Sequence, residues 1–272
     1  MCGADTPVGF LAQVKEEAAR ENVPQPQSVA FLVDSVIAMS LPDNIASIRQ
    51  RMASAARRAG RRADDVALMA VTKTHPPERI REAHASGLRL FGENRVQEFA
   101  GKAAALADLA GARWHMIGHV QTNKAGKTAE LFSAVDSIDS LKLVERLDAA
   151  ARALNKRLSV LIEINVGGEA AKSGIAPDAR ELEELLLAAP RFEALEFRGL
   201  MTVPPFSDDP EEARPYFCKL RELRDTIAAR KLLGIGMGVL SMGMSHDFEV
   251  AIEEGSTCVR VGTAIFGERE KK

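Results

Sequence analysis

Short apolar runs alternate with amphipathic segments from residue 66 to residue 261, and this alternation constrains the fold more than any other feature of the chain. The runs with the length and composition of strands are Val66–Lys73, Leu88–Gly92, Arg113–Ile117, Ala134–Ile138, Ser159–Val166, Glu196–Val203, Gly238–Met242 and Cys258–Val261. Runs that are apolar at nearly every residue are typical of parallel strands covered by helices. Eight strand–helix units in about 230 residues predict a single (β/α)8 TIM barrel, an α/β fold. An open doubly wound sheet is the alternative, but it favours a glycine-rich loop after its first strand, and Thr72–Pro77 contains no glycine.

Helical patterns fill the intervals between these strands. The expected helices are Pro77–Ser86, Arg95–Leu106, Lys124–Phe132, Leu141–Leu154, Pro177–Ala188, Pro210–Ala229 and Asp247–Glu254. One additional helix precedes the first strand, because Asp43 or Asn44 can cap an amphipathic segment that continues to about Gly60. Residues 1–38 contain several prolines and no strand pattern. We therefore expect residues 1–38 to be an extension outside the barrel and residues 39–272 to form the barrel domain.

The composition excludes several classes of protein. The formal net charge is -2, which does not favour binding to nucleic acid or to an anionic membrane. No apolar segment reaches the roughly 18 residues of a membrane-spanning helix. The three cysteines are far apart and the five histidines have no metal-ligand spacing. These features predict a cytoplasmic protein without a metal site that binds neither nucleic acid nor a membrane.

Lys73 is the first candidate functional residue. It closes the apolar run Val66–Val71 and precedes a turn that contains Pro76 and Pro77. Partial burial of a lysine favours the neutral amine, a nucleophile that forms Schiff bases with carbonyl compounds. Taken alone, a lysine at a strand end more commonly extends into solvent. The last two strands favour the functional interpretation, because they carry groups suited to an anion.

The segments that follow the last two strands predict an anion site. The loop Ser241–Ser245 (SMGMS) leads into the last expected helix, and Arg260 is followed by Gly262 and Thr263. Hydroxyl groups, glycine-rich backbone and helix N-termini bind phosphate, and TIM barrels commonly bind it after strands seven and eight. Each feature alone is typical of an ordinary cap or strand end. Together they favour a ligand that carries both a phosphate group, bound at this site, and an aldehyde group, whose carbon faces Lys73.

Six motifs follow one another along this part of the chain. They are Val71–Pro76 (VTKTHP), Phe91–Glu98 (FGENRVQE), Trp114–Lys124 (WHMIGHVQTNK), Gly199–Val203 (GLMTV), Leu240–Asp247 (LSMGMSHD) and Val259–Gly267 (VRVGTAIFG). In content and order they resemble the motifs of the pyridoxal phosphate homeostasis protein family, and the resemblance extends from about Pro42 to Arg269. It implies a single barrel like the N-terminal, cofactor-binding domain of alanine racemase, with pyridoxal 5'-phosphate (PLP) as the cofactor.

The resemblance also implies the roles of individual residues. The cofactor-binding residues are Lys73 for the Schiff base, Ser241, Met242, Gly262 and Thr263 for the phosphate, Arg260 for the pyridine nitrogen, and Asn94 and Met201 for the walls of the ring pocket. A guanidinium cannot accept the pyridine proton, so the ring would be a poorer electron sink than one paired with aspartate. We expect a monomeric, non-enzymatic PLP carrier in intracellular homeostasis, with no catalytic residues and with apo PLP-dependent enzymes as its partners.

Two other functions could use the same lysine. An amino-acid racemase needs an acid or base on each face of the substrate, but the single tyrosine, Tyr216, falls in the helix after strand six, and no second domain is expected after the barrel. A class I aldolase would act on a phosphorylated sugar without a cofactor. The remaining polar residues are interpreted structurally. We expect Glu93 and Glu98 on solvated helix faces, and His75 and His119 as polar loop residues.

Overall fold

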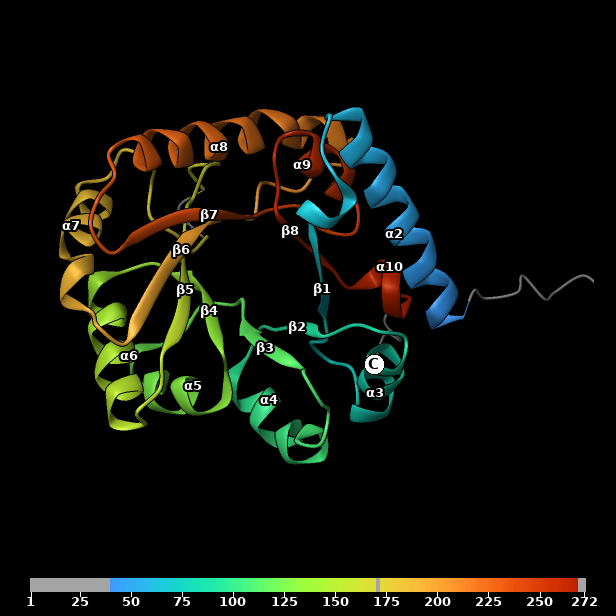
Figure 1. Cartoon of the computed structure of the whole chain (residues 1–272), viewed down its shortest axis with the longest axis horizontal. Coiled ribbons are helices and arrows are strands. Elements are labelled where there is room, and N and C mark those ends of the chain that lie inside the picture. Colours follow the sequence, from blue (N-terminus) through green and yellow to red (C-terminus); the bar gives the residue numbers. More distant parts are fainter. Residues whose placement is uncertain (1–39, 170–171, 269–272) are drawn as a thin grey trace, which may run out of the picture. The chain divides into compact units, whose positions relative to one another are not determined.

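Eight parallel strands close into a barrel whose order around the ring follows the order in the sequence (Figure 1). The computed structural model describes residues 40–169 and 172–268, so the predicted extension at residues 1–38 lies outside the described residues. The ring closes where the last strand pairs with the first, with Met69 opposite Arg260 in the register. Helices surround the strands on the outside (Figure 1). The predicted (β/α)8 barrel is confirmed.

Every predicted strand is present, with bounds that differ by a few residues. The strands are β1 (Ala67–Val71), β2 (Leu90–Glu93), β3 (Arg113–Met116), β4 (Ala134–Ile138), β5 (Leu158–Glu163), β6 (Leu195–Met201), β7 (Ile235–Ser241) and β8 (Cys258–Val261). The largest extension is at β7, which begins at Ile235 and includes Gly236, a residue type that is usually sparse in strand interiors.

The α-helices alternate with these strands. They are α2 (Leu41–Arg58), α3 (Pro77–Ala85), α4 (Val96–Ala103), α5 (Ala125–Leu131), α6 (Leu141–Ala153), α7 (Arg180–Ala188), α8 (Arg214–Ala229), α9 (Phe248–Glu253) and α10 (Thr263–Phe266). The cap of α2 was predicted wrongly. Ser40 is the N-cap, and Asp43, the third residue of the helix, completes a capping box in which its carboxylate accepts from the Ser40 N–H. The short α10 was not predicted, because four residues are too few for a helical pattern to be visible in the sequence.

Apolar side chains form a core between the barrel and the helices. Phe91, Trp114, Phe99 and Phe132 pack in series, with ring centroids 4.8, 4.6 and 5.0 Å apart, so that they join β2 and β3 to α4 and the end of α5. A smaller cluster inside the barrel contains Met69, Leu90 and Cys258. Aromatic contacts of this kind stabilise packing beyond the effect of buried area.

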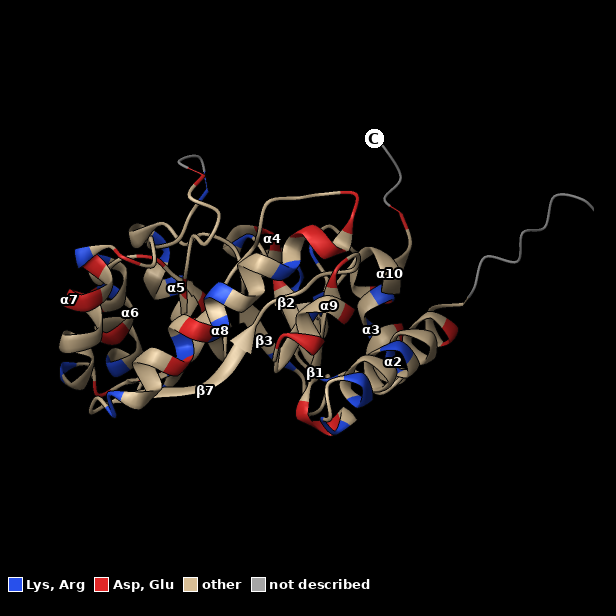
Figure 2. Cartoon of the chain, turned by 90° about the horizontal axis from the view of Figure 1, so that it is seen from above, with Lys and Arg blue, Asp and Glu red and all other residues tan. Residues whose placement is uncertain are grey.

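The outer surface carries charges of both signs. Lys and Arg residues are interspersed with Asp and Glu residues along α7 and α8 (Figure 2), as is usual for exposed helix faces. Within the described ranges, no helix combines the length and apolarity needed to cross a membrane.

Candidate functional site

The predicted cofactor-binding residues lie at the C-terminal ends of five strands. Lys73 lies just beyond β1, and Asn94 comes directly after β2. Met201 and Ser241 are the last residues of β6 and β7, and they are opposite each other in the register. Because parallel barrel strands all point the same way, these ends share one face of the barrel. The structure therefore brings residues from distant parts of the sequence to the face where TIM-barrel active sites occur.

Arg260 connects the ends of three strands. Its side chain is buried, at 3% exposure. Nη1 donates to Ser241 Oγ at 2.7 Å, and Nη2 donates to the Thr202 carbonyl oxygen at 2.7 Å. Burial lowers the pKa of the Arg260 guanidinium from its ordinary value, but a guanidinium stays charged in proteins. Arg260 is thus a fixed positive charge inside the barrel, and it orients the Ser241 hydroxyl.

A second serine lies where backbone donors converge. Ser245 Oγ accepts from the N–H of Gly262 at 3.2 Å and from the N–H of Ala264 at 3.3 Å. These N–H groups belong to the start of α10, whose first turn has no earlier carbonyl partners. Two donors on one oxygen atom form an arrangement that also suits a phosphate oxygen. Ser241, rather than Ser245, was predicted for this role. Ser245 could have been identified from the sequence, because it lies nearer the start of the next helix.

The Met242 N–H is engaged elsewhere. It donates to the Cys258 carbonyl oxygen at 3.1 Å, and the Met242 side chain is fully buried. The geometry therefore gives this N–H no role in holding a phosphate. Cys258 is also excluded as a nucleophile, because burial raises the pKa of its thiol to about 12.

Two glycines show which strand ends are neighbours of Asn94 and Lys73, and one of them allows a close approach. A Cβ added to Gly118 would lie 2.3 Å from the Asn94 carbonyl oxygen, so the end of β3 contacts the end of β2 only because residue 118 is glycine. A Cβ added to Gly262 would lie 3.4 Å from Val71. The end of β8 is thus beside the end of β1, and the predicted anion-binding residues of β8 are neighbours of Lys73 in the ring.

The interpretation of Glu93 as a solvated helix residue is wrong. Glu93 is the last residue of β2, fully buried, and forms an ion pair with the buried Lys102 of α4 at 2.9 Å. Its neighbour Glu98 does lie on α4, where it also pairs with Lys102, at 3.1 Å. Phe91 and Glu93 both point toward the helix layer, because side chains alternate along a strand.

The predicted loop histidines are less buried than Glu93. His119 shares a hydrogen bond of 2.7 Å with Asp139, and the ring of His75 stacks on the ring of Phe266.

Polar residues inside the barrel were missed by the sequence analysis. His115 Nδ1 lies 3.1 Å from Asp136 Oδ1, across β3 and β4. Glu163, at the end of β5, accepts from Ser173 Oγ at 2.9 Å, while its Oε2 has no hydrogen-bond partner in the described part of the chain. Burial raises the pKa of Glu163, an effect that the Ser173 hydrogen bond partly offsets. Asp136 and Glu163 interrupt otherwise apolar runs, and that interruption was the available signal.

Replacing Glu163 with glutamine should change how stability depends on pH. A carboxyl group whose pKa is raised by folding holds its proton more tightly in the folded state. The wild type therefore loses stability as the pH rises from the unfolded pKa, about 4.3, through the folded pKa. Glutamine does not titrate, so the stability of Glu163→Gln relative to the wild type should increase with pH between pH 4.5 and pH 8. Urea unfolding across this range measures the difference, and a difference that does not vary with pH would contradict the prediction.

No group of three or more His, Cys, Asp or Glu residues within residues 40–169 and 172–268 could hold a metal ion.

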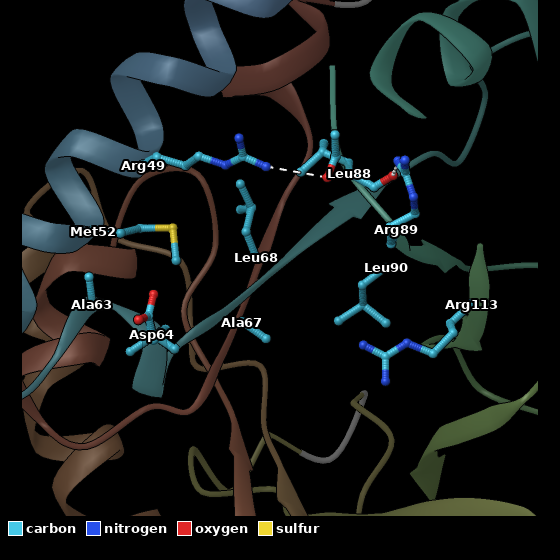
Figure 3. A pocket seen from close by; sticks show the side chains of 12 residues that line it. Arg49, Met52, Ala63, Asp64, Ala67, Leu68, Leu88, Arg89, Leu90 and Arg113 are labelled. Carbon is cyan, nitrogen blue, oxygen red and sulfur yellow. Dashed lines mark hydrogen bonds between the residues drawn. The ribbon is translucent and has the colours of Figure 1, made fainter. Parts of the chain in front are cut away.

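A pocket of about 430 Å³ lies at the other end of the barrel, around the first residues of β1, β2 and β3 (Figure 3). Arg49 and Arg89 in its wall donate to nearby backbone carbonyls, Arg49 to Gly87 and Arg89 to His84 and Leu88. The N-terminal face of a TIM barrel usually serves stability, and none of the predicted cofactor-binding residues lines this pocket.

A closed barrel with a lysine after its first strand and anion-binding groups after its last is the arrangement of a PLP-binding barrel. The family model described as "Alanine racemase, N-terminal domain" matches residues 44–270. Within that class, the chain belongs to the pyridoxal phosphate homeostasis protein family.

Relatives and a solved structure support this assignment. The Pyridoxal phosphate homeostasis protein of Aquifex aeolicus is 46% identical over 85% of this chain and 100% of its own length. The protein of the same name from Pseudomonas aeruginosa is 45% identical over 85% of this chain and 96% of its own. The structure of PipY of Synechococcus elongatus with PLP bound is 35% identical, covers 84% of this chain and 100% of PipY, and has a TM-score of 0.73.

Proposed function

We propose that this protein binds PLP through Lys73 and acts in intracellular PLP homeostasis as a cytoplasmic, monomeric carrier or buffer without robust catalytic turnover. The observation that carries the proposal is the position of Lys73 after β1, beside the end of β8. The names of the Aquifex and Pseudomonas relatives and the PLP in the PipY structure support it. Apo PLP-dependent enzymes would be the recipients of the cofactor.

The residues around this face fit the parts of PLP. The N–H groups of Gly262 and Ala264 and the hydroxyl of Ser245 would hold the phosphate, because the two N–H groups already converge on an oxygen atom, and the predicted Thr263 lies between them in the chain. Arg260 would present positive charge to the pyridine nitrogen and keep that nitrogen unprotonated. Bound PLP supplies an aldehyde that reacts with amines and a ring that withdraws electrons. Asn94 and Met201, at the ends of β2 and β6, would line the ring, and Ser241 would orient Arg260.

A racemase is the second candidate, because the family includes alanine racemase domains. Racemisation needs a second acid or base on the face opposite the lysine. Tyr216, the single tyrosine of the chain, lies on α8 in the outer helix layer, where it packs against the core and beneath Lys219. That position favours the carrier over the racemase.

Exchange of the alanine α-proton with deuterated water tests the absence of turnover. With PLP bound, the protein should exchange the α-proton of L- or D-alanine more slowly than about 1 s⁻¹, the lower end of ordinary enzymatic rates. Proton NMR of the alanine α-signal measures the rate, with PLP alone in buffer as the control. Sustained exchange at an ordinary enzymatic rate would contradict the carrier function and favour the racemase function.

We also propose that residues 39–272 suffice for PLP binding. The family match begins at residue 44, and α2, which follows Ser40, is tied to α10 by a hydrogen bond of 3.0 Å from Asn44 Nδ2 to the Ile265 carbonyl oxygen. Both observations support a barrel domain that begins close to Met39.

A further inference from the structure

The turn that carries Lys73 has an unfavourable backbone conformation. Thr74 has φ of 68°, in the left-handed region that β-branched residues rarely adopt. Such a conformation persists only where the surroundings hold it. The contacts of the residues on either side of Lys73 show which groups hold this conformation.

Lys102 of α4 holds the carbonyl groups of the turn. Its Nζ donates to the Thr72 carbonyl oxygen at 3.0 Å and reaches the His75 carbonyl oxygen at 3.4 Å. The same nitrogen lies 2.9 Å from Glu93 Oε1 and 3.1 Å from Glu98 Oε1. An ammonium has three N–H donors, so Lys102 distributes all of them between the turn and the two carboxylates.

The two carboxylates hold other groups of the same turn. Glu98 Oε1 accepts from the Thr74 N–H at 2.5 Å, and Glu93 Oε1 accepts from the Thr72 hydroxyl. The residue before Lys73 and the two residues after it are therefore bound by charged groups from β2 and α4. We name Glu93, Glu98 and Lys102 the turn clamp.

The turn clamp is costly to bury. Glu93 is fully buried, Lys102 is 7% exposed, and Glu93 Oε2 has no hydrogen-bond partner in the described residues. Burial raises the pKa of Glu93, although Lys102 and the Thr72 hydroxyl oppose this effect. A buried ion pair commonly contributes less to stability than well-packed apolar side chains of similar volume. Stability alone therefore does not explain why charged groups occupy this position.

We propose that the turn clamp positions Lys73 for reaction with the cofactor, and that Lys102 and Glu93 are positioning residues rather than catalytic ones. The ion pair fixes the backbone on both sides of Lys73 and so restricts where its amine can lie. The positioning of Lys73 for a covalent reaction with PLP rests on the proposed function. The restraint of the turn by the turn clamp does not.

The test compares the wild type with Glu98→Met, with the double variant Glu93→Gln/Lys102→Met and with Lys156→Met. The double variant removes both buried charges together, so neither charge is left unpaired. Glu98 is partly exposed, which favours folding of its variant. Lys156 is the matched control: its Nζ donates to the Ala129 carbonyl oxygen at 2.7 Å and the Phe132 carbonyl oxygen at 2.5 Å at the end of α5. Circular dichroism confirms folding before each measurement.

Two measurements decide the proposal. Stopped-flow absorbance with free PLP should show that both clamp variants form the borohydride-reducible linkage at least tenfold more slowly, whereas Lys156→Met should match the wild type. Hydrogen exchange without PLP should show reduced protection of the Thr74 N–H in both clamp variants. Linkage at the wild-type rate in folded clamp variants, or unchanged Thr74 protection, would overturn the proposal. A wild type that forms no linkage would instead refute the proposed function, and the exchange measurement would still decide whether the clamp restrains the turn.

Discussion

Replacing Lys73 with alanine should abolish the covalent linkage to PLP completely. Lys73 follows β1 at the C-terminal face of the barrel, beside the end of β8, and a Schiff base requires an amine within reach of the aldehyde. Borohydride reduction followed by mass spectrometry should show one PLP adduct on the wild type and none on Lys73→Ala. Peptide mapping should locate the wild-type adduct at residue 73.

The phosphate contacts should survive this substitution. Hydrogen bonds to charged groups contribute about 1.5–3 kcal/mol each, so Lys73→Ala should still bind PLP non-covalently in equilibrium dialysis. Lys124→Ala is a suitable control, because Lys124 lies in the short helix before α5 and should leave the adduct unchanged. An adduct on Lys124 or Lys172 in the wild type would show that the assignment to Lys73 is wrong.

Replacing Gly199 with alanine should destabilise the barrel strongly. A Cβ at residue 199 would lie 1.9 Å from the Val239 carbonyl oxygen and 2.7 Å from its carbonyl carbon, across the β6–β7 pair. These atoms belong to the backbone of a paired strand, so the strands would have to separate. We expect the free energy of unfolding to fall by about 3 kcal/mol or more, the upper end for overpacking. Urea unfolding followed by circular dichroism measures the change.

Gly238 offers a matched control on the neighbouring strand. A Cβ at residue 238 would meet no atom within 4 Å, so Gly238→Ala should change the free energy of unfolding by no more than about 0.5 kcal/mol. Equal stability of the two variants would mean that the β6–β7 pair can relax at Gly199, contrary to the prediction.

Much of the fold was predictable because the strands are buried on both faces. Largely apolar runs such as Ala134–Ile138 and Cys258–Val261 coincide with β4 and β8, since a strand inside a barrel and under helices has no solvent-exposed face. Lys73 and Gly262 stood out as candidate site residues because they follow such runs, and Arg260 because a charged residue interrupts one. The errors fell where the local pattern is ambiguous. Glu93 was assigned to a solvated helix because a carboxylate beside a helical segment is usually exposed, whereas it is the buried end of β2.

The sequence by itself determined the number and order of the strands, the helices between them and the lysine at the end of the first strand, because these depend on local periodicity and composition. The tertiary structure alone decided which polar groups meet. Ser245 reaches Gly262, Arg260 reaches Ser241, and Lys102 reaches the turn at Thr72 only in the folded barrel. The partners in these contacts are 17, 19 and 30 residues apart along the chain. No local pattern specifies such contacts, because they depend on how β7 pairs with β8 and how α4 packs beside the ends of β1 and β2.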